Sequence, residues 1–442
     1  MATNAALALR PAEPVGAEAA SEPWDDPAKF TRDDGDAYFA AVKARVAAYL
    51  ESSGKSRFDD GTILLKGLLF GSLAALFYAL VLANSHQAWV LQLFAIGFGV
   101  SALLLALNVG HDAAHNSLSP HRRLNTVVQT VVFTVLGANA YLWRLRHVKS
   151  HHVFPNVNGC DIDVDTTYFL RLSPNQRRRW YHRWQHLYAP LIFWLVDVHS
   201  VFWQDFEYLF KRRLANMRDI RHPIGQYALF AACKLAYVAI VFAIPFAALD
   251  RPWWHIVAGA LVMSFVASAL FVTLLIGTHF AEETVFPNVG PDGRVPHSWV
   301  THALITSLDW SPESRVANFI AGGVNAHAAH HLFPTVAHIH YVAITRIIRE
   351  EAARHGMPYN AVSLRGMILS HIRFLKRLGR GDQASAAIST TTLPMTAPPS
   401  TASCAAAISA RGSRRATECV NAPCSIIAVS SAMPARSGSG SS

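Results

Sequence analysis

The feature that most constrains this chain is a run of 45 residues, from Gly67 to His111, that contains no Asp, Glu, Lys or Arg. A membrane-spanning helix needs about 20 apolar residues, so this run is long enough for two spans. The polar tetrapeptide from Asn84 to Gln87 interrupts it and predicts a tight turn between them. Charged residues make up 15% of the chain, against about 25% in soluble domains. A membrane protein is therefore favoured over a soluble protein with four buried helices.

Two further apolar segments predict two more spans. Residues 252–281 carry no charge, and residues 224–249 contain only Lys234. If that span begins near Phe230, Lys234 lies near one end, where its long side chain can reach the membrane surface. We therefore predict an all-α membrane protein with four transmembrane helices, at about residues 62–84, 88–108, 228–249 and 253–278.

Basic residues are concentrated in one part of the chain. Fifteen Lys or Arg residues lie between Val109 and Arg221, whereas the turns at 84–87 and 250–252 hold only Arg251. By the positive-inside rule the basic segment is cytoplasmic, and its basic runs lie against anionic headgroups. Nucleic-acid binding is not favoured, because the basic residues flank membrane spans. The five cysteines form no CxxC pair, which argues against a zinc ribbon or a rubredoxin-like site.

The apolar run from Leu124 to Trp143 is long enough to cross the membrane, but it contains Asn125, Gln129 and Asn139, and arginines flank both its ends. We predict that it does not cross. The membrane domain is expected to cover residues 35–380 and to begin with an amphipathic helix at 35–51, which lies on the membrane or packs on a cytoplasmic helical cap. Residues 1–34 and the tail 381–442 are predicted to be disordered, because neither can bury enough apolar surface to fold.

Nine histidines stand at the ends of apolar segments. They fall in the stretches HDAAH, HVKSHH, HFAEETVFP and NAHAAHHLFP, and their numbers are His111, His115, His147, His151, His152, His279, His327, His330 and His331. Because a helix turns about 100° per residue, His111 and His115 share a face, as do His147 and His151. His327, His330 and His331 fall within an arc of about 100°.

This pattern predicts a shared metal site. Neutral imidazole is a good ligand for iron, copper, nickel and zinc, and nine histidines exceed the four ligands of one tetrahedral zinc, so two metals are expected. The second and fourth spans both return the chain to the same side, where the clusters can meet. A zinc-dependent membrane hydrolase would carry a motif such as HExxH, which is absent. A metal transporter would hold its ligands at membrane depth rather than at span ends.

The histidine boxes resemble those of the integral-membrane fatty acid desaturase family, whose mark is HxxxH, HxxxHH and HxxHH in that order. The resemblance covers roughly residues 35–380 and is closest to the bacterial acyl-lipid or linoleoyl-CoA desaturase-like branch. The segment that begins at His279 is similar to one that supplies an additional histidine ligand in this family. The stretch HHVFPNVNGCDIDVD is similar to the family sequence after the second box, at Asn156, Gly159, Asp161 and Asp163.

The resemblance implies a non-haem di-iron centre whose ligands are the nine histidines. It implies a bacterial inner-membrane enzyme that inserts a cis double bond into an acyl lipid or acyl-CoA, using O₂ and two electrons from ferredoxin, rubredoxin or cytochrome b5. Acceptors that orient the imidazoles would be Asp112, Asp161 and Asp163, and His302 is a weaker candidate beside the site. His182, His186, His338 and His340 are interpreted as structural or surface residues.

Two positions depart from the family pattern. Many members carry Glu where this chain has Ala329, and front-end members often carry Gln where it has His327. These departures leave the position of the double bond open. The boxes also do not distinguish desaturation from hydroxylation or ketolation of a fatty acid or carotenoid, because hydroxyl rebound competes with the second hydrogen abstraction.

Overall fold

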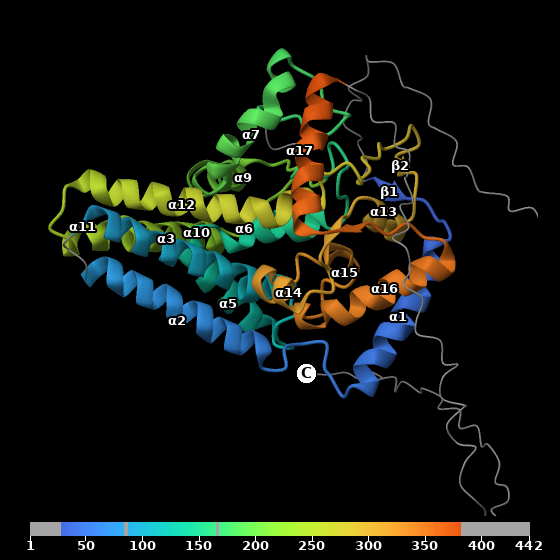
Figure 1. Cartoon of the computed structure of the whole chain (residues 1–442), viewed down its shortest axis with the longest axis horizontal. Helices are drawn as coiled ribbons and strands as arrows, with labels where there is room; N and C mark the ends of the chain where they lie inside the picture. The colour runs from blue at the N-terminus through green and yellow to red at the C-terminus, as the bar shows by residue number, and fades with distance from the viewer. Residues whose placement is uncertain (1–27, 84–86, 165–167, 382–442) are drawn as a thin grey trace, which may run out of the picture. The chain divides into compact units, whose positions relative to one another are not determined.

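The computed structural model describes residues 28–83, 87–164 and 168–381, all within the compact unit Met1–Ser389 (Figure 1). Most of the sequence assigned to disordered tails lies outside the described residues. Gly381, the C-cap of the last helix, is described, and so are residues 28–34, which form strand β1 (Lys29–Phe30) and lead into helix α1 (Gly35–Ser52). Strand β1 pairs in parallel with β2 (Arg294–Val295), so this short segment is tied to the folded domain.

Four helices are long and apolar enough to cross a membrane, and they lie together on one side of the domain in Figure 1. Their bounds are Thr62–Ala83, Ala88–Ala114, Ile224–Ala248 and Trp253–Thr278. The first is α2 (Thr62–Ala83). The others are made from α3 (Ala88–Leu105) with α4 (His111–Ala114), α10 (Ile224–Val238) with α11 (Ile244–Ala248), and α12 (Trp253–Leu275). The four predicted spans are therefore present as helices, and the second and third are longer than expected.

The first spanning helix shows why these segments fold locally as they do. The Asp59 carboxylate accepts hydrogen bonds from the N–H groups of Ile63 and Leu64, at 2.7 and 3.0 Å, and so caps the first turn of α2. Beyond the cap, Leu64 and Leu65 are more than 60% exposed on the outer surface of the bundle. Exposed leucines on a helix of this length match a lipid-facing surface.

The apolar run from Leu124 to Trp143 lies in two helices, α5 (Arg122–Leu136) and α6 (Ala140–Arg144), and the chain bends by 111° between them. Gly137 ends α5 in the left-handed region at φ 86°, and a Cβ there would lie 2.8 Å from the Tyr237 ring. The run begins and ends at the same end of the bundle, because His111 before it and His147 after it lie 3.2 Å apart. That contact agrees with the prediction that this run does not cross.

Lys234 is not placed as the sequence predicted. Its span begins at Ile224 rather than near Phe230, so the lysine lies well inside the helix. Its Nζ atom points into the protein and donates to Asp205 Oδ2 at 2.7 Å and to the carbonyls of Gly137 and Val201 at 2.8 and 2.6 Å. The side chain turns inward because three buried acceptors are available to it, which makes a route to the membrane surface unnecessary.

The remaining helices form a cap at the end of the bundle that carries the histidine boxes. They are α7 (Gln185–Trp194), α8 (Val196–His199), α9 (Asp205–Phe210), α13 (Trp299–Ile305), α14 (Arg315–Ala321), α15 (His327–Leu332), α16 (Tyr341–His355) and α17 (Leu364–Arg380). The predicted amphipathic helix α1 packs on this cap: it buries Tyr38, Val42 and Val46 in a core shared with α16. A second parallel pair joins β3 (Asp309–Trp310) to β4 (Ala361–Val362).

Candidate metal centre

The three histidine boxes meet where the spanning helices enter the cap. The first box follows a π-helical turn, Ala106–Gly110, in the second spanning helix. The second lies in a π-helical stretch, Leu145–His151, that continues α6, and the third forms α15. His279 directly follows the fourth spanning helix. Most of these side chains are buried, so the boxes enclose a site rather than line an open surface.

The histidines form two groups of four, each with ring nitrogens within 4.8 Å of one another. The first group takes one or two histidines from each box: His111, His115, His147 and His330. The second group adds the histidine after span four: His151, His279, His327 and His331. His152 lies between them, with its Nε2 atom 3.1 Å from that of His147 and 2.9 Å from that of His330. All nine predicted histidines are therefore brought together.

The chemistry of the second group fits a bound cation. The Nδ1 atom of His279 lies 2.8 Å from the Thr306 carbonyl, and that of His327 lies 3.1 Å from the Val324 carbonyl. Each Nδ1 therefore carries the proton, and each Nε2 presents a bare lone pair. These two Nε2 atoms are nevertheless only 2.7 Å apart, and both lie within 3.2 Å of the Nε2 of His331. Such separations suit nitrogens about 2 Å from one shared ion.

Several buried ring nitrogens of these histidines are unpaired among the described residues. Five buried ring nitrogens of the nine histidines have no hydrogen-bond partner in the described part of the chain: His111 Nδ1, His115 Nε2, His152 Nδ1, His330 Nδ1 and His331 Nδ1. Buried polar atoms are normally paired, because leaving one unpaired costs about 1–3 kcal/mol. Four of these atoms are Nδ1 atoms of rings whose Nε2 atoms already face other box histidines, so the fit to two metal ions rests on the facing Nε2 atoms and on the unpaired Nε2 of His115.

The electrostatics keep the imidazoles neutral, as metal ligation requires. Burial, followed by repulsion from neighbouring imidazoles, lowers the pKa values of His147, His152 and His330 well below the usual range. Burial lowers the pKa of His327 to about 3. His151 is different: burial lowers its pKa, but the Asp161 carboxylate acts in the opposite direction and the net shift is upward.

The predicted acceptors have different roles in the structure. Asp161 lies 3.2 Å from His151 Nδ1 and also accepts from the Asn156 N–H, so it orients a box histidine. Asp163 lies 3.7 Å from the same ring nitrogen and pairs with Arg146. The hydrogen bonds of Asp112 go to the backbone and ring of His338, both at 3.1 Å, rather than to a box histidine.

His302 lies outside both metal groups. Its Nε2 atom is 2.8 Å from the Pro155 carbonyl, so the side chain holds the loop that follows the second box. His182, which the sequence suggested is structural, binds the Tyr168 carbonyl and the Arg179 N–H. His338 bridges Asp112 and Lys66, with its Nε2 atom 2.7 Å from the lysine Nζ. None of these three histidines faces the metal groups.

Sequence reasoning gave no role to three residues that support the site. Trp143 stacks on the His147 ring with 4.3 Å between centroids, and its spacing of four positions could have indicated the contact. Asn156 has φ 64° and donates from Nδ2 to the His279 and Val285 carbonyls, which ties the second box to the histidine after span four. The Asp309 carboxylate accepts from the Ala328 N–H at the start of α15, 19 residues along the chain, and no local sequence pattern predicts this contact.

Comparison with known proteins agrees with this geometry. Residues 87–363 match the family model described as fatty acid desaturase. The chain belongs to the fatty acid desaturase family. It is an oxidoreductase that acts on fatty acids. The matched range contains all nine histidines, and the family resemblance noted in the boxes is thereby confirmed.

Curated desaturases of this family align along most of the chain. An sn-1 linoleoyl-lipid 6-desaturase of Arthrospira platensis is 28% identical over 357 residues, which cover 78% of this chain and 93% of that protein. An enzyme of the same name from Synechocystis sp. is 27% identical, with 80% and 98% covered. An acyl-lipid (8-3)-desaturase of Physcomitrium patens is 28% identical, with 77% and 72% covered.

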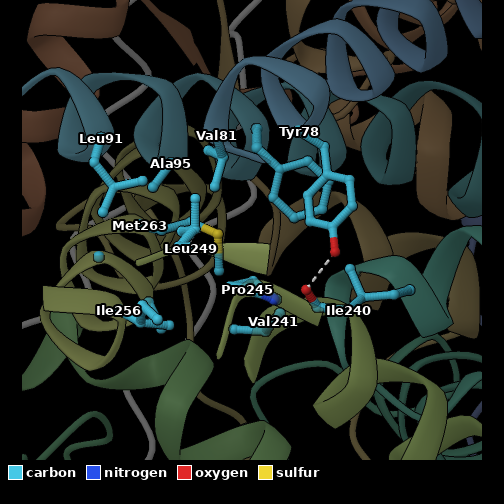
Figure 2. Close-up of a pocket in the computed structure, with 13 residues that line it drawn as sticks. Tyr78, Val81, Leu91, Ala95, Ile240, Val241, Pro245, Leu249, Ile256 and Met263 are labelled. Carbon is cyan, nitrogen blue, oxygen red and sulfur yellow. Dashed lines mark hydrogen bonds between the residues drawn. The ribbon is translucent and has the colours of Figure 1, made fainter. Parts of the chain in front are cut away.

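The membrane bundle of this desaturase contains an apolar cavity of about 40 Å³, shown in Figure 2. Its lining includes Leu91 and Ala95 of α3, Ile256 of α12 and Tyr78 of α2, whose hydroxyl donates to the Ile240 carbonyl at 2.7 Å. A smaller cavity shares Phe98 and Met263 with it and reaches Ala102 and the end of α5. Neither cavity is lined by a box histidine, but Ala102 lies about 14 Å along the helix from His111.

Proposed function

We propose that this protein inserts a cis double bond into the acyl chain of a membrane glycerolipid, at two iron ions held by the nine histidines. The carrying observation is the pair of four-histidine groups, in which bare Nε2 atoms of His279 and His327 face each other 2.7 Å apart. Bound iron would supply the O₂-dependent removal of two hydrogens from neighbouring methylenes. The balance is one O₂, two electrons and two protons consumed, with one double bond and two waters formed.

The residues of the chain contribute binding and orientation. The carbonyls of Thr306 and Val324 accept from the Nδ1 atoms of His279 and His327, and Asp161 does the same for His151. These contacts fix which ring nitrogen faces the metals and hold each ring at its angle. The depressed pKa values of His279 and His327 keep these two ligands unprotonated at neutral pH. Burial of the boxes keeps bulk water away from the reacting carbons.

Apolar space in the bundle supports an acyl substrate. The two cavities share Phe98 and Met263 and lie between the spans, and Ala102 in the smaller cavity is about 14 Å along the helix from His111. A glycerolipid is favoured over acyl-CoA because the relatives named above act, by their names, on lipid-linked chains. The positive-inside distribution supports a site on the cytoplasmic side of the membrane, where ferredoxin, rubredoxin or cytochrome b5 would supply electrons.

A lipid profile tests this proposal. The chain is produced in a host with a compatible electron donor, and the fatty acids of each lipid class are analysed by gas chromatography and mass spectrometry. New double bonds should appear first in glycerolipids and vanish with His331→Ala, whereas His121→Ala, at an exposed histidine, leaves them unchanged. If the new double bonds appear first in acyl-CoA, the substrate is acyl-CoA rather than a glycerolipid. Hydroxylated or keto products would favour the related oxygenase reaction. Unchanged lipids together with bound zinc would contradict both the desaturase and the oxygenase reaction.

A further inference from the structure

Helix α15 carries ligands for both metal groups but lacks a cap of its own. His330 faces the first group, and His327 and His331 face the second. The helix has only six residues, and its N-cap residue, Ala326, offers no side-chain hydrogen bond. Its first N–H groups are buried, where an unpaired donor is costly. The placement of α15 therefore depends on groups outside the helix.

Asp309 supplies the missing acceptor from strand β3. Its Oδ1 atom lies 2.8 Å from the Ala328 N–H, and the His327 N–H also hydrogen-bonds to this carboxylate. The side chain is fully buried, so water does not compete for these bonds. A carboxylate at the start of a helix also interacts favourably with the exposed N–H groups there. Asp309 thus acts as an N-cap for a helix 19 residues further along the chain.

The carboxylate is itself held in place by the C-terminal part of the domain. The Tyr359 hydroxyl donates to Asp309 Oδ2 at 2.7 Å. The Asp309 backbone N–H donates to the Asn360 carbonyl at 3.0 Å, next to the pairing of β3 with β4. The neighbouring Trp310 N–H donates to the Asn325 carbonyl at 2.9 Å, two residues before α15. A rigid connection therefore runs from β4 through Asp309 to the third histidine box.

We propose that Asp309 is a positioning residue that sets the place and rotation of α15, so that both metal ions depend on it, and that Tyr359 braces its carboxylate. This rests on the proposed two-metal function. Because α15 supplies ligands to both groups, loss of Asp309 is expected to weaken the binding of both ions together. In contrast, loss of Asp161, which orients only His151, is expected to weaken one ion.

The test is metal binding by the purified full chain, measured as iron per chain by mass spectrometry and as titration of the metal-free protein with Co²⁺ followed by its absorption bands. The wild type is expected to bind two ions. Asp309→Ala should weaken both by about 10–100-fold, the usual effect of losing a group that orients ligands. Asp309→Asn keeps an oxygen for the Ala328 N–H and should restore most of the binding. Asp161→Asn should weaken one ion only.

Ser363→Ala is the matched control: it removes the cap of α17, where the serine accepts from the Gly366 N–H, and should leave two ions bound. Two ions bound at wild-type affinity in Asp309→Ala, or loss of only one, would overturn the inference. If that variant does not fold, Tyr359→Phe decides: binding of both ions should weaken measurably, and unchanged binding would equally refute it. A wild type that binds no metal would contradict the proposed function itself.

Discussion

The sequence predicts that Lys234 reaches the membrane surface, whereas the structure places it in a buried ion pair with Asp205, and substitution of the lysine distinguishes the two. The lysine side chain is 12% exposed and the aspartate 7%. All three Nζ hydrogens have acceptors, namely Asp205 Oδ2 and the carbonyls of Gly137 and Val201. The pair joins the third span to the end of α5 and to α9, which lie far apart in the sequence.

Replacement of Lys234 by Met should be strongly destabilising. It leaves a buried carboxylate that still accepts from the Asn139 N–H at 2.8 Å but has lost its counter-ion, and it leaves two carbonyls without their lysine partner. Breaking a buried pair from one side costs about 3–5 kcal/mol. Asp205→Asn should cost less than Lys234→Met: the buried lysine loses its counter-ion, but it keeps both carbonyls, and the amide oxygen can accept in place of the carboxylate.

Comparison of the single variants with a double variant tests whether the buried charge is the cause. Unfolding of the protein in detergent is followed by the loss of helical circular dichroism during denaturant titration. The double variant Lys234→Met with Asp205→Leu should be more stable than Lys234→Met alone, because no buried charge is left unpaired. Lys55→Met, at an exposed pair with 3.8 Å between its charged atoms, serves as a control and should change little. If Lys234→Met is as stable as the wild type, Lys234 does not form a buried ion pair with Asp205 and instead reaches the membrane surface.

Two further predictions concern the histidine site. The metal-free protein should lose stability as the pH falls from about 6.5 to 5, because the unfolded chain takes up protons at histidines whose pKa values are lowered in the folded state. This contribution to stability is fully present above about pH 6.5, and each such histidine loses up to about 1.4 kcal/mol per pH unit below it. Denaturant titration at several pH values measures the loss. A flat profile would contradict neutral, buried imidazoles. Gly322→Ala should destabilise by about 2 kcal/mol or more in the same assay, since φ is +60° and a Cβ would lie 2.2 Å from the Leu107 carbonyl oxygen. Gly71→Ala, with open space around it, should be neutral or slightly stabilising, and equal effects at the two glycines would count against the close approach at Gly322.

The four spans and the meeting of the histidine boxes could be predicted because both depend on local properties. Hydropathy over about 20 residues decides whether a segment spans, whatever the rest of the chain does. The number of turns between boxes then decides on which side each one emerges. The 3.2 Å contact between His111 and His147 agrees with that reasoning. Exact ends were less well predicted: the second span continues through a π-helical turn to Ala114, and the third begins at Ile224, before the predicted start at residue 228.

The division of the histidines between two groups could not be predicted in the same way. His147 and His151 were expected to share a helix face, yet one belongs to the first group and the other to the second. The π-helical stretch Leu145–His151 changes the angle between successive side chains, and no propensity rule predicts such a stretch. Asp112 was expected to orient a box histidine, but His338, 226 residues away, supplies its hydrogen bonds.

By itself, the sequence determined that this chain would form four apolar helices and deliver nine histidines to one end of them. Those outcomes follow from helix periodicity and from the cost of burying charge in lipid, and both act over a few turns of helix. Only the tertiary structure decided which ring faces which ion, which acceptors turn Lys234 inward, and that Asp309 holds the start of α15. Those outcomes depend on contacts between segments far apart in the chain, and such contacts are fixed by packing rather than by any local pattern.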